Sequence, residues 1–257
     1  LMPGDIYRGE LIGKDHFGPG APADSLFRSA AVWDKVAVNN HFSESSDTPL
    51  QVLIRLIQQS HLPGAQEQLS RIMDMKAWGR FSAFESLVQT AHTDEIHNWR
   101  IYFDPWRNQF VPIAWDSMGW HDRLRAAKFK NEVIANSLMR ALFHNGDFIR
   151  ARSEALRSFF TSGKDQTFLG IVSKAVGTME REVDTDPYLK PAKPDFVKRK
   201  MRHLEEVIQG VLAEKDDIFL ENDPRLGLVI ASTHFDQQNL DLVVRGKHPV
   251  DVLRLNL

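Results

Sequence analysis

The sequence predicts an α+β protein in which helix predominates over strand. Residues 94–116, DEIHNWRIYFDPWRNQFVPIAWD, form a β-hairpin pattern, because two aromatic and β-branched runs flank the turn-forming segment DPWRNQ. Apolar residues recur at helical spacing before this hairpin and over most of residues 131–221. The other strand-like runs are short, so we expect one central hairpin in a mostly α protein.

Composition excludes several function classes. The 257 residues, of which 42% are hydrophobic and 26% charged, indicate a globular protein with a sizeable core, in one large domain or two small ones. The net charge of −2 argues against a nucleic-acid partner. The absence of cysteine excludes disulfides and thiolate metal sites, and it leaves the compartment open.

No apolar run reaches the ~20 residues that a membrane-spanning helix needs, and no signal peptide is present. We therefore expect no membrane span in this chain. Because the chain begins with Leu1 close to a predicted strand around Ile6 and Tyr7, we also expect the complete protein to extend upstream.

Residues 1–47 are rich in Gly, Pro, Asp and Ser, which predicts one short strand and then loop. Gly9, Gly13 and Gly18 have the spacing of a phosphate loop, but they lack a strand-to-helix context and a GK[ST] ending.

Three helices are predicted between this region and the hairpin. Thr48 as N-cap and Pro49 at the first helical position begin a helix to about Gln59. Pro63-Gly64 interrupts it, and a short helix follows to about Met73. Asp74 caps a third helix to about Ala91, whose apolar stripe we interpret as core: Trp78, Phe81, Phe84, Leu87 and Val88.

The segment after the hairpin is predicted to be helical in several pieces. A first helix from Asn131 ends at Asn145-Gly146, and further helices span about 148–160, 168–183 and 196–215. The run KRKMRH in the last of these is interpreted as a solvated face rather than a phosphate or partner site. Short β runs follow at 226–230 and 240–244.

The hairpin register predicts a cluster of polar side chains. A turn centred on Trp106 and Arg107 pairs Phe103 with Phe110, and Pro112 places the second strand at a sheet edge. Continued pairing puts Asp116 at the same end as Asp94. Two carboxylates this close need a cation to offset their repulsion, and oxygen ligands suit Mg²⁺. The alternative is that both aspartates only cap turns or helices.

An ordered series of motifs runs through residues 4–221: Gly4-Asp5-Ile6-Tyr7-Arg8, Trp33-Asp34-Lys35, the helix Leu50 to Ile57, the helix start Asp74 to Trp78, Asp94 with His97-Asn98-Trp99, and Pro112-Ile113-Ala114-Trp115-Asp116. This series resembles the C-terminal part of the spore-coat CotH kinase family.

The resemblance implies the C-terminal lobe of an atypical protein-kinase-like fold, with the N-terminal lobe largely missing from this chain. It implies transfer of phosphate from ATP to Ser or Thr of a protein substrate, aided by Mg²⁺ or Mn²⁺, in a bacterial spore coat or extracytoplasmic setting. By position, Asp94 resembles the catalytic-loop aspartate, and Asn98 resembles a metal-binding asparagine. Asp116 resembles the aspartate that holds the metal on the nucleotide phosphates. Residues 1–221 would form this domain, and residues 222–257 a short β-containing tail or the start of another.

Two departures from the family pattern keep alternatives open. Met118 stands where the family has a second acid, with His121 and Asp122 nearby, and neither Lys14 nor Lys35 is assigned as the ATP-positioning lysine. A catalytically inactive scaffold or binding module is therefore the second hypothesis. A metal-dependent hydrolase is the third, with candidate ligands His92, Asp94, His97, Asp116 and His121, although their spacing matches no HExxH-type motif.

Overall fold

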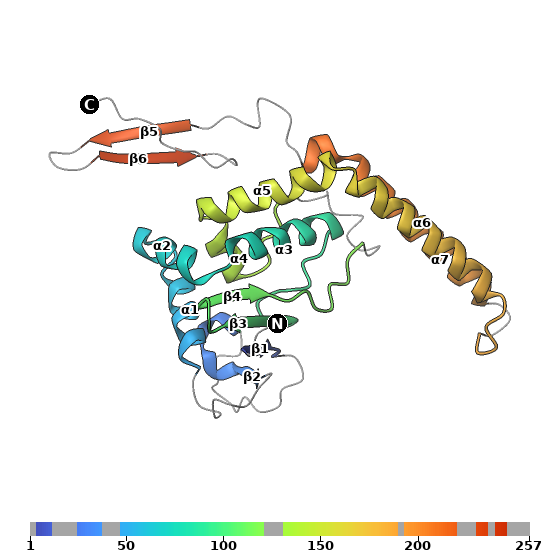
Figure 1. The fold of residues 1–257 in the computed structure, drawn as a ribbon, viewed down its shortest axis with the longest axis horizontal. Helices are drawn as coiled ribbons and strands as arrows, with labels where there is room; N and C mark the ends of the chain where they lie inside the picture. Colours follow the sequence, from blue (N-terminus) through green and yellow to red (C-terminus); the bar gives the residue numbers. More distant parts are fainter. Residues whose placement is uncertain are drawn as a thin grey trace.

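The computed structural model describes residues 4–11, 25–37, 47–120, 131–189, 193–219, 230–235 and 240–245. Within these ranges the protein is mixed α+β and mostly helical, as expected, with a small four-stranded antiparallel sheet of order β2-β1-β3-β4. Helices cover one side of this sheet, and a long helical hairpin projects away from it (Figure 1).

The N-terminal region contains more strand than the sequence predicts. Strand β1 (Asp5–Gly9) confirms the expected strand, but a second strand, β2 (Trp33–Ala37), lies where only loop is expected. β2 pairs antiparallel with β1, and Arg8 faces Asp34 across the pair. Two short 3-10 turns, Leu26–Arg28 and Ala30–Val32, lead into β2, and their N-caps are Ser25 and Ser29.

The predicted hairpin is confirmed. β3 (Trp99–Asp104) pairs with β4 (Gln109–Pro112), and Phe103 lies opposite Phe110. The Asp104 carboxylate accepts the backbone N–H groups of Trp106 and Arg107, which shapes the turn between the strands. β4 is an edge strand, as Pro112 predicts.

Three helices precede the hairpin: α1 (Thr48–Gln58), α2 (Pro63–Ile72) and α3 (Met75–Val88). The N-cap of α1 is Asp47, not Thr48, since Thr48 already has helical geometry. Asp74 caps α3 as predicted, and its carboxylate accepts the N–H of Ala77. The prediction that Phe84 belongs to the core is wrong, since Phe84 is 37% exposed.

The first helix after the hairpin is shorter than expected. α4 spans only Ser137–Leu142, since Asn136 is its N-cap and residues 131–136 are non-helical. Asn145 does not simply end that helix but caps the next, α5 (Gly146–Thr161), by accepting the N–H groups of Asp147 and Phe148.

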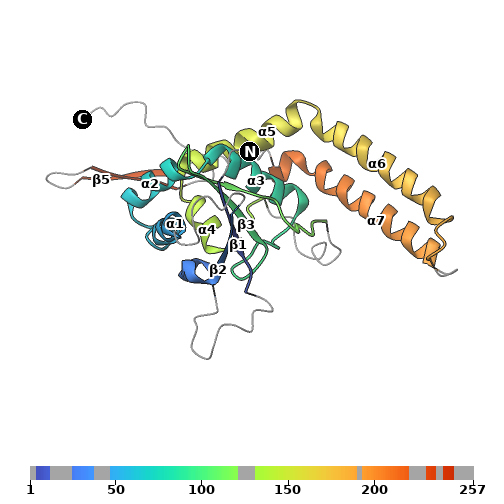
Figure 2. The same cartoon turned by 60° about the horizontal axis from the view of Figure 1, so that its bottom comes forward.

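Helices α6 (Lys164–Val183) and α7 (Lys193–Ala213) form the projecting hairpin (Figures 1 and 2). Ion pairs Lys198–Asp184 and Arg202–Glu180 join the two helices, so part of the basic run faces acids of α6. A five-residue π-helical turn, Lys215–Phe219, follows α7. Strands β5 (Ile230–Phe235) and β6 (Leu240–Arg245) pair only with each other among the described strands, and β5 lies C-terminal to its predicted position.

The main core lies between the sheet and helices α1 to α5. Trp99 is central to it, with Phe27, Trp33 and Trp78 in aromatic contact around its ring. A second apolar cluster joins the C-terminal parts of α5 and α7. Among the helices whose residues are described, none is long and apolar enough to cross a membrane.

Candidate functional site

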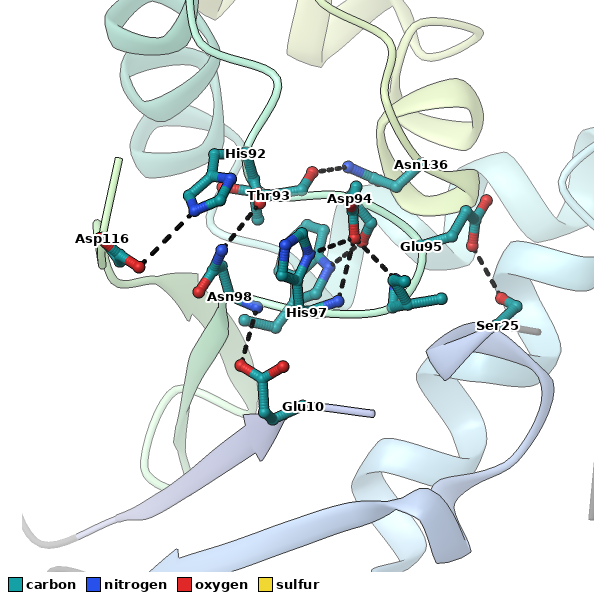
Figure 3. Close-up of polar contacts among 12 residues, drawn as sticks. Glu10, Ser25, His92, Thr93, Asp94, Glu95, His97, Asn98, Asp116 and Asn136 are labelled. Carbon is teal, nitrogen blue, oxygen red and sulfur yellow. Dashed lines mark hydrogen bonds and ion pairs between the residues drawn. The ribbon is translucent and has the colours of Figure 1, made fainter. Parts of the chain in front are cut away.

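The loop that carries Asp94, residues 89–98 between α3 and β3, is anchored through its own backbone carbonyls (Figure 3). Five consecutive carbonyl oxygens, those of residues 92–96, each accept a hydrogen bond from a different residue, and Figure 3 shows the bonds from Asn98 to His92 and from Asn136 to Thr93. The pairs are Asn98 Nδ2 to His92 (3.2 Å), Asn136 Nδ2 to Thr93 (2.8 Å), Trp99 Nε1 to Asp94 (2.6 Å), Leu26 N to Glu95 (2.8 Å) and Leu11 N to Ile96 (2.7 Å). Three of the donors come from other parts of the fold: Leu11 follows β1, Leu26 lies in the first 3-10 turn, and Asn136 is the N-cap of α4. The loop is therefore fixed to separate parts of the fold.

The Asp94 carboxylate is held through one oxygen. Its Oδ1 accepts the backbone N–H groups of Ile96 (2.8 Å) and His97 (3.0 Å) and lies 2.6 Å from Nδ1 of His97. A carboxylate oxygen accepts in such a contact, so the tautomer of His97 that suits this geometry is the one with N–H at Nδ1. The other oxygen, Oδ2, accepts no hydrogen bond from the part of the chain that the structure describes.

Asn98 follows in a left-handed backbone conformation, with φ of 65°. This region is tolerated by Asn more readily than by most residues. Its backbone N–H donates to Oε2 of Glu10 (3.4 Å), and its amide nitrogen donates to His92 O. Those contacts leave Oδ1 of Asn98 without a donor among the described residues.

Asp116 lies in a strained segment. Asp116, Met118 and Trp120 all have positive φ, at 44°, 26° and 54°. Such strain persists only where surrounding contacts impose it. Trp120 supplies them, since its backbone N–H donates to Val88 O (2.7 Å) and its indole to Leu87 O (3.0 Å). Asp116 itself is 53% exposed, and its Oδ2 lies 3.6 Å from Nε2 of His92.

The three residues singled out from the sequence lie around a histidine pair, and no direct contact between the Asp94 and Asp116 carboxylates is present among the described contacts. The rings of His92 and His97 contact edge to face, 4.9 Å between centroids. Asp94 faces His97 and Asp116 faces His92, and Figure 3 shows the two acids on opposite sides with Asn98 and the histidines between them. Within the described ranges no group of three or more His, Cys, Asp or Glu side chains is arranged to hold a metal. A cation here would depend on Asn98 and on ligand oxygens as well.

A buried acid supports the loop from α3. Glu85 is 2% exposed, and this burial raises its pKa to about 8, although a hydrogen bond from Thr93 acts in the opposite direction. Its Oε2 has no hydrogen-bond partner in the described structure. At neutral pH the side chain is therefore mostly protonated, directly under the residue that precedes Asp94.

An open cavity of about 480 Å³ lies on the Glu95 side of the loop. Glu95 accepts hydrogen bonds there from the hydroxyls of Ser25 (2.7 Å) and Ser137 (2.5 Å), and Arg28 and Arg140 also line the cavity. None of the three predicted site residues lines it.

Sequence reasoning missed the residues that position the loop. Asn136 precedes a short apolar helix, a signal for an N-cap, but its bond to Thr93 joins segments that no local pattern connects. Trp99 reads as a core residue, and nothing local reveals that its indole binds the Asp94 carbonyl.

Several predicted features lie outside the described residues, namely Gly13, Lys14, Gly18, His121 and Asp122. Comparison with known proteins finds neither a family model nor a curated protein that matches this sequence.

Proposed function

We propose that this protein transfers the terminal phosphate of ATP to Ser or Thr hydroxyls of a protein substrate, in the manner of a CotH-like atypical kinase. The observation that supports the proposal is the hydrogen bonding of the Asp94 carboxylate. Its Oδ1 is fixed by three contacts while Oδ2 accepts no hydrogen bond from the described residues, in a loop whose carbonyls are anchored at five points. Phosphoryl transfer requires such fixed positioning more than covalent chemistry.

In this mechanism Asp94 Oδ2 accepts the proton of the substrate hydroxyl. The hydroxyl oxygen forms a bond to the γ-phosphorus while the bond from that phosphorus to the bridging oxygen breaks, which releases ADP. His97 and the two backbone N–H groups keep the carboxylate in one orientation throughout.

The residues that would hold Mg²⁺ or Mn²⁺ are Asn98 and Asp116. Asn98 Oδ1 has no donor within the described chain, and the Asp116 carboxylate is largely exposed. Mg²⁺ is commonly bound by one or two carboxylates together with substrate phosphates, so a small protein ligand set fits it. When bound, the cation neutralises charge on the phosphate oxygens.

The test is transfer of radiolabelled γ-phosphate from ATP to an acceptor protein such as casein. We expect Asp94→Asn and Asp116→Asn to abolish transfer, because each removes a carboxylate that the mechanism uses. Asp195→Asn, at an exposed position in α7, is the matched control and should retain full transfer. Undiminished transfer by either site variant would refute the assigned roles.

A second candidate function, a catalytically inactive binding module, is favoured by Met118. This residue is 55% exposed at the position where the family resemblance expects an acid. A module of this kind would show no Mg²⁺-dependent thermal stabilisation by ATP, whereas an ATP-binding enzyme must be stabilised by its ligand.

A third candidate, the metal-dependent hydrolase, relies on the contact between His92 and His97. The described residues contain no three-ligand His, Cys, Asp or Glu group, which makes this reading the least supported. Stoichiometric, tightly bound Zn²⁺ in the purified protein would favour it.

A further inference from the structure

Arg100 is a fixed cation on the outer face of the sheet. Its guanidinium lies over the ring of Trp115, 4.7 Å from the ring centroid, and Nη1 donates to the carbonyl of Trp99 (2.7 Å). Cation–π contact and a backbone hydrogen bond restrict the side chain without neutralising its charge. Arg100 forms no ion pair with any acid that the structure describes.

The charged residues around Arg100 make the lack of an ion pair between its guanidinium and any described acid unusual. In the β1–β3 register Arg100 lies directly opposite Arg8, and like charges in that position destabilise a sheet. Arg8 has its own partner, since its Nε and Nη2 bind Oδ2 of Asp34 at 3.0 and 2.5 Å. Burial and then Arg8 lower the pKa of Arg100, while Glu10 and Asp34 act in the opposite direction. The charge on Arg100 is thus only partly compensated.

The position of Arg100 links it to the candidate site. Asn98 lies two residues before it on the same chain segment, and Asp116 follows the Trp115 on which its guanidinium is stacked. The backbone N–H of Ile113 donates to Arg100 O (3.0 Å), one hydrogen bond beyond the last paired residues of β3 and β4, Ile101 and Pro112. An anion bound by Arg100 would therefore lie in the part of the hairpin from which both proposed metal ligands come.

We propose that Arg100, held in place by Trp115, binds a phosphate group beside Asn98 and Asp116. The planar guanidinium is suited to bidentate contact with phosphate oxygens, and the stacking reduces the conformational entropy lost on binding. This inference rests on the proposed function and extends it, because it names the residue that would hold the phosphates of the nucleotide. Glu10 lies near the site and repels the anion.

The experiment is isothermal titration calorimetry of the whole chain with tripolyphosphate, with and without MgCl₂. We expect Arg100→Gln to weaken binding at least tenfold, which corresponds to losing one charge-assisted contact of about 1.4 kcal/mol. Arg100→Lys should lose less, since it keeps the charge but not the planar fork. Arg107→Gln is the matched control: Arg107 lies at the opposite end of the same hairpin, paired with Asp74, and its replacement should leave the affinity within twofold. Glu10→Gln should tighten binding.

Equal affinities for Arg100→Gln and Arg107→Gln, with circular dichroism showing both folded, would overturn the inference, as would no binding by the unmodified protein. Titrations with ATP and with adenosine identify the source of the phosphate. Tighter binding of ATP than of tripolyphosphate, with the same dependence on Arg100, assigns the site to a nucleotide, and equal affinities assign it to free phosphate. If tripolyphosphate binding depends on Arg100 while the Asp94 and Asp116 variants still transfer phosphate, only the proposed roles of those aspartates fail. If the Asp94 and Asp116 variants lose phosphate transfer while tripolyphosphate binding does not depend on Arg100, only the Arg100 site fails.

Discussion

Asn136 performs two tasks at once, and two substitutions separate them. Its Oδ1 accepts the N–H of Met139 (2.8 Å) and so caps α4, while its Nδ2 donates to the carbonyl of Thr93 (2.8 Å). The side chain is 1% exposed, so water cannot replace either bond. Asn136→Ala removes both bonds. Asn136→Asp keeps the cap but replaces the donor with a carboxylate that faces a carbonyl.

The magnitudes follow from those bonds. Losing the cap costs about 1 kcal/mol, and leaving the Thr93 carbonyl unsatisfied costs about 1–3 kcal/mol. Asn136→Ala should therefore lower the free energy of unfolding by about 2–4 kcal/mol. At neutral pH, Asn136→Asp should lower the free energy of unfolding by at least the part that comes from the unsatisfied Thr93 carbonyl. Its deficit should shrink as the pH falls, because a protonated carboxyl can donate to Thr93 O.

Urea denaturation followed by circular dichroism measures both values, and the pH series is run on the unmodified protein in parallel. The phosphate-transfer assay should show a loss for Asn136→Asp under conditions where it remains folded, since Thr93 precedes Asp94. If Asn136→Asp matches the unmodified protein in stability at neutral pH, the Thr93 bond does not contribute, and the reasoning about loop anchoring is wrong.

Three other predictions test different parts of the structure. Burial raises the pKa of Glu85 from its ordinary value of 4.5 to about 8 in the folded state. The free energy of unfolding should therefore fall as the pH rises from 4.5 to about 8, by at most about 1.4 kcal/mol per pH unit. Glu85→Gln should remove this slope and stabilise the protein above pH 8 in urea titrations. Gly79→Ala should cost about 1–3 kcal/mol, because a Cβ would lie 2.6 Å from the Arg152 backbone nitrogen where α3 packs on α5, whereas Gly210→Ala, with open space around it, should gain up to about 1 kcal/mol. Met118→Asp should increase Mg²⁺-dependent stabilisation by ATP in a thermal-shift titration, since it restores the second acid of the family pattern.

Each of these has a contrary outcome. An unchanged pH slope in Glu85→Gln would mean that another group produces it. Equal effects of the two alanine substitutions would show that the contact at Gly79 is easily relaxed. If Met118→Asp responds to Mg²⁺ and ATP like the unmodified protein, the second acid has no part in metal binding here.

Local chemistry made several elements predictable. The turn at 104–109 follows from Pro105 and from Asp104, whose carboxylate binds the turn N–H groups, and it sets the pairing of Phe103 with Phe110. Asp74 was recognisable as the cap of α3 because capping depends on residues three positions apart. β2 was missed because its five residues become a strand through pairing with β1.

In the candidate site, too, some features are predictable from the sequence and others depend on the tertiary structure. Turn chemistry predicts the hairpin register, which the structure shows from Asp104–Gln109 to Ile101–Pro112, whereas Asp94 and Asp116 lie outside the paired residues. Only the tertiary structure decides which partner each acid has, because His92 and His97 insert between them. It also decides what fixes the loop, since Asn136, Leu26 and Leu11 reach its carbonyls from distant segments. Hydrogen bonds between segments far apart in the chain depend on packing of the whole core, which no short stretch of sequence encodes.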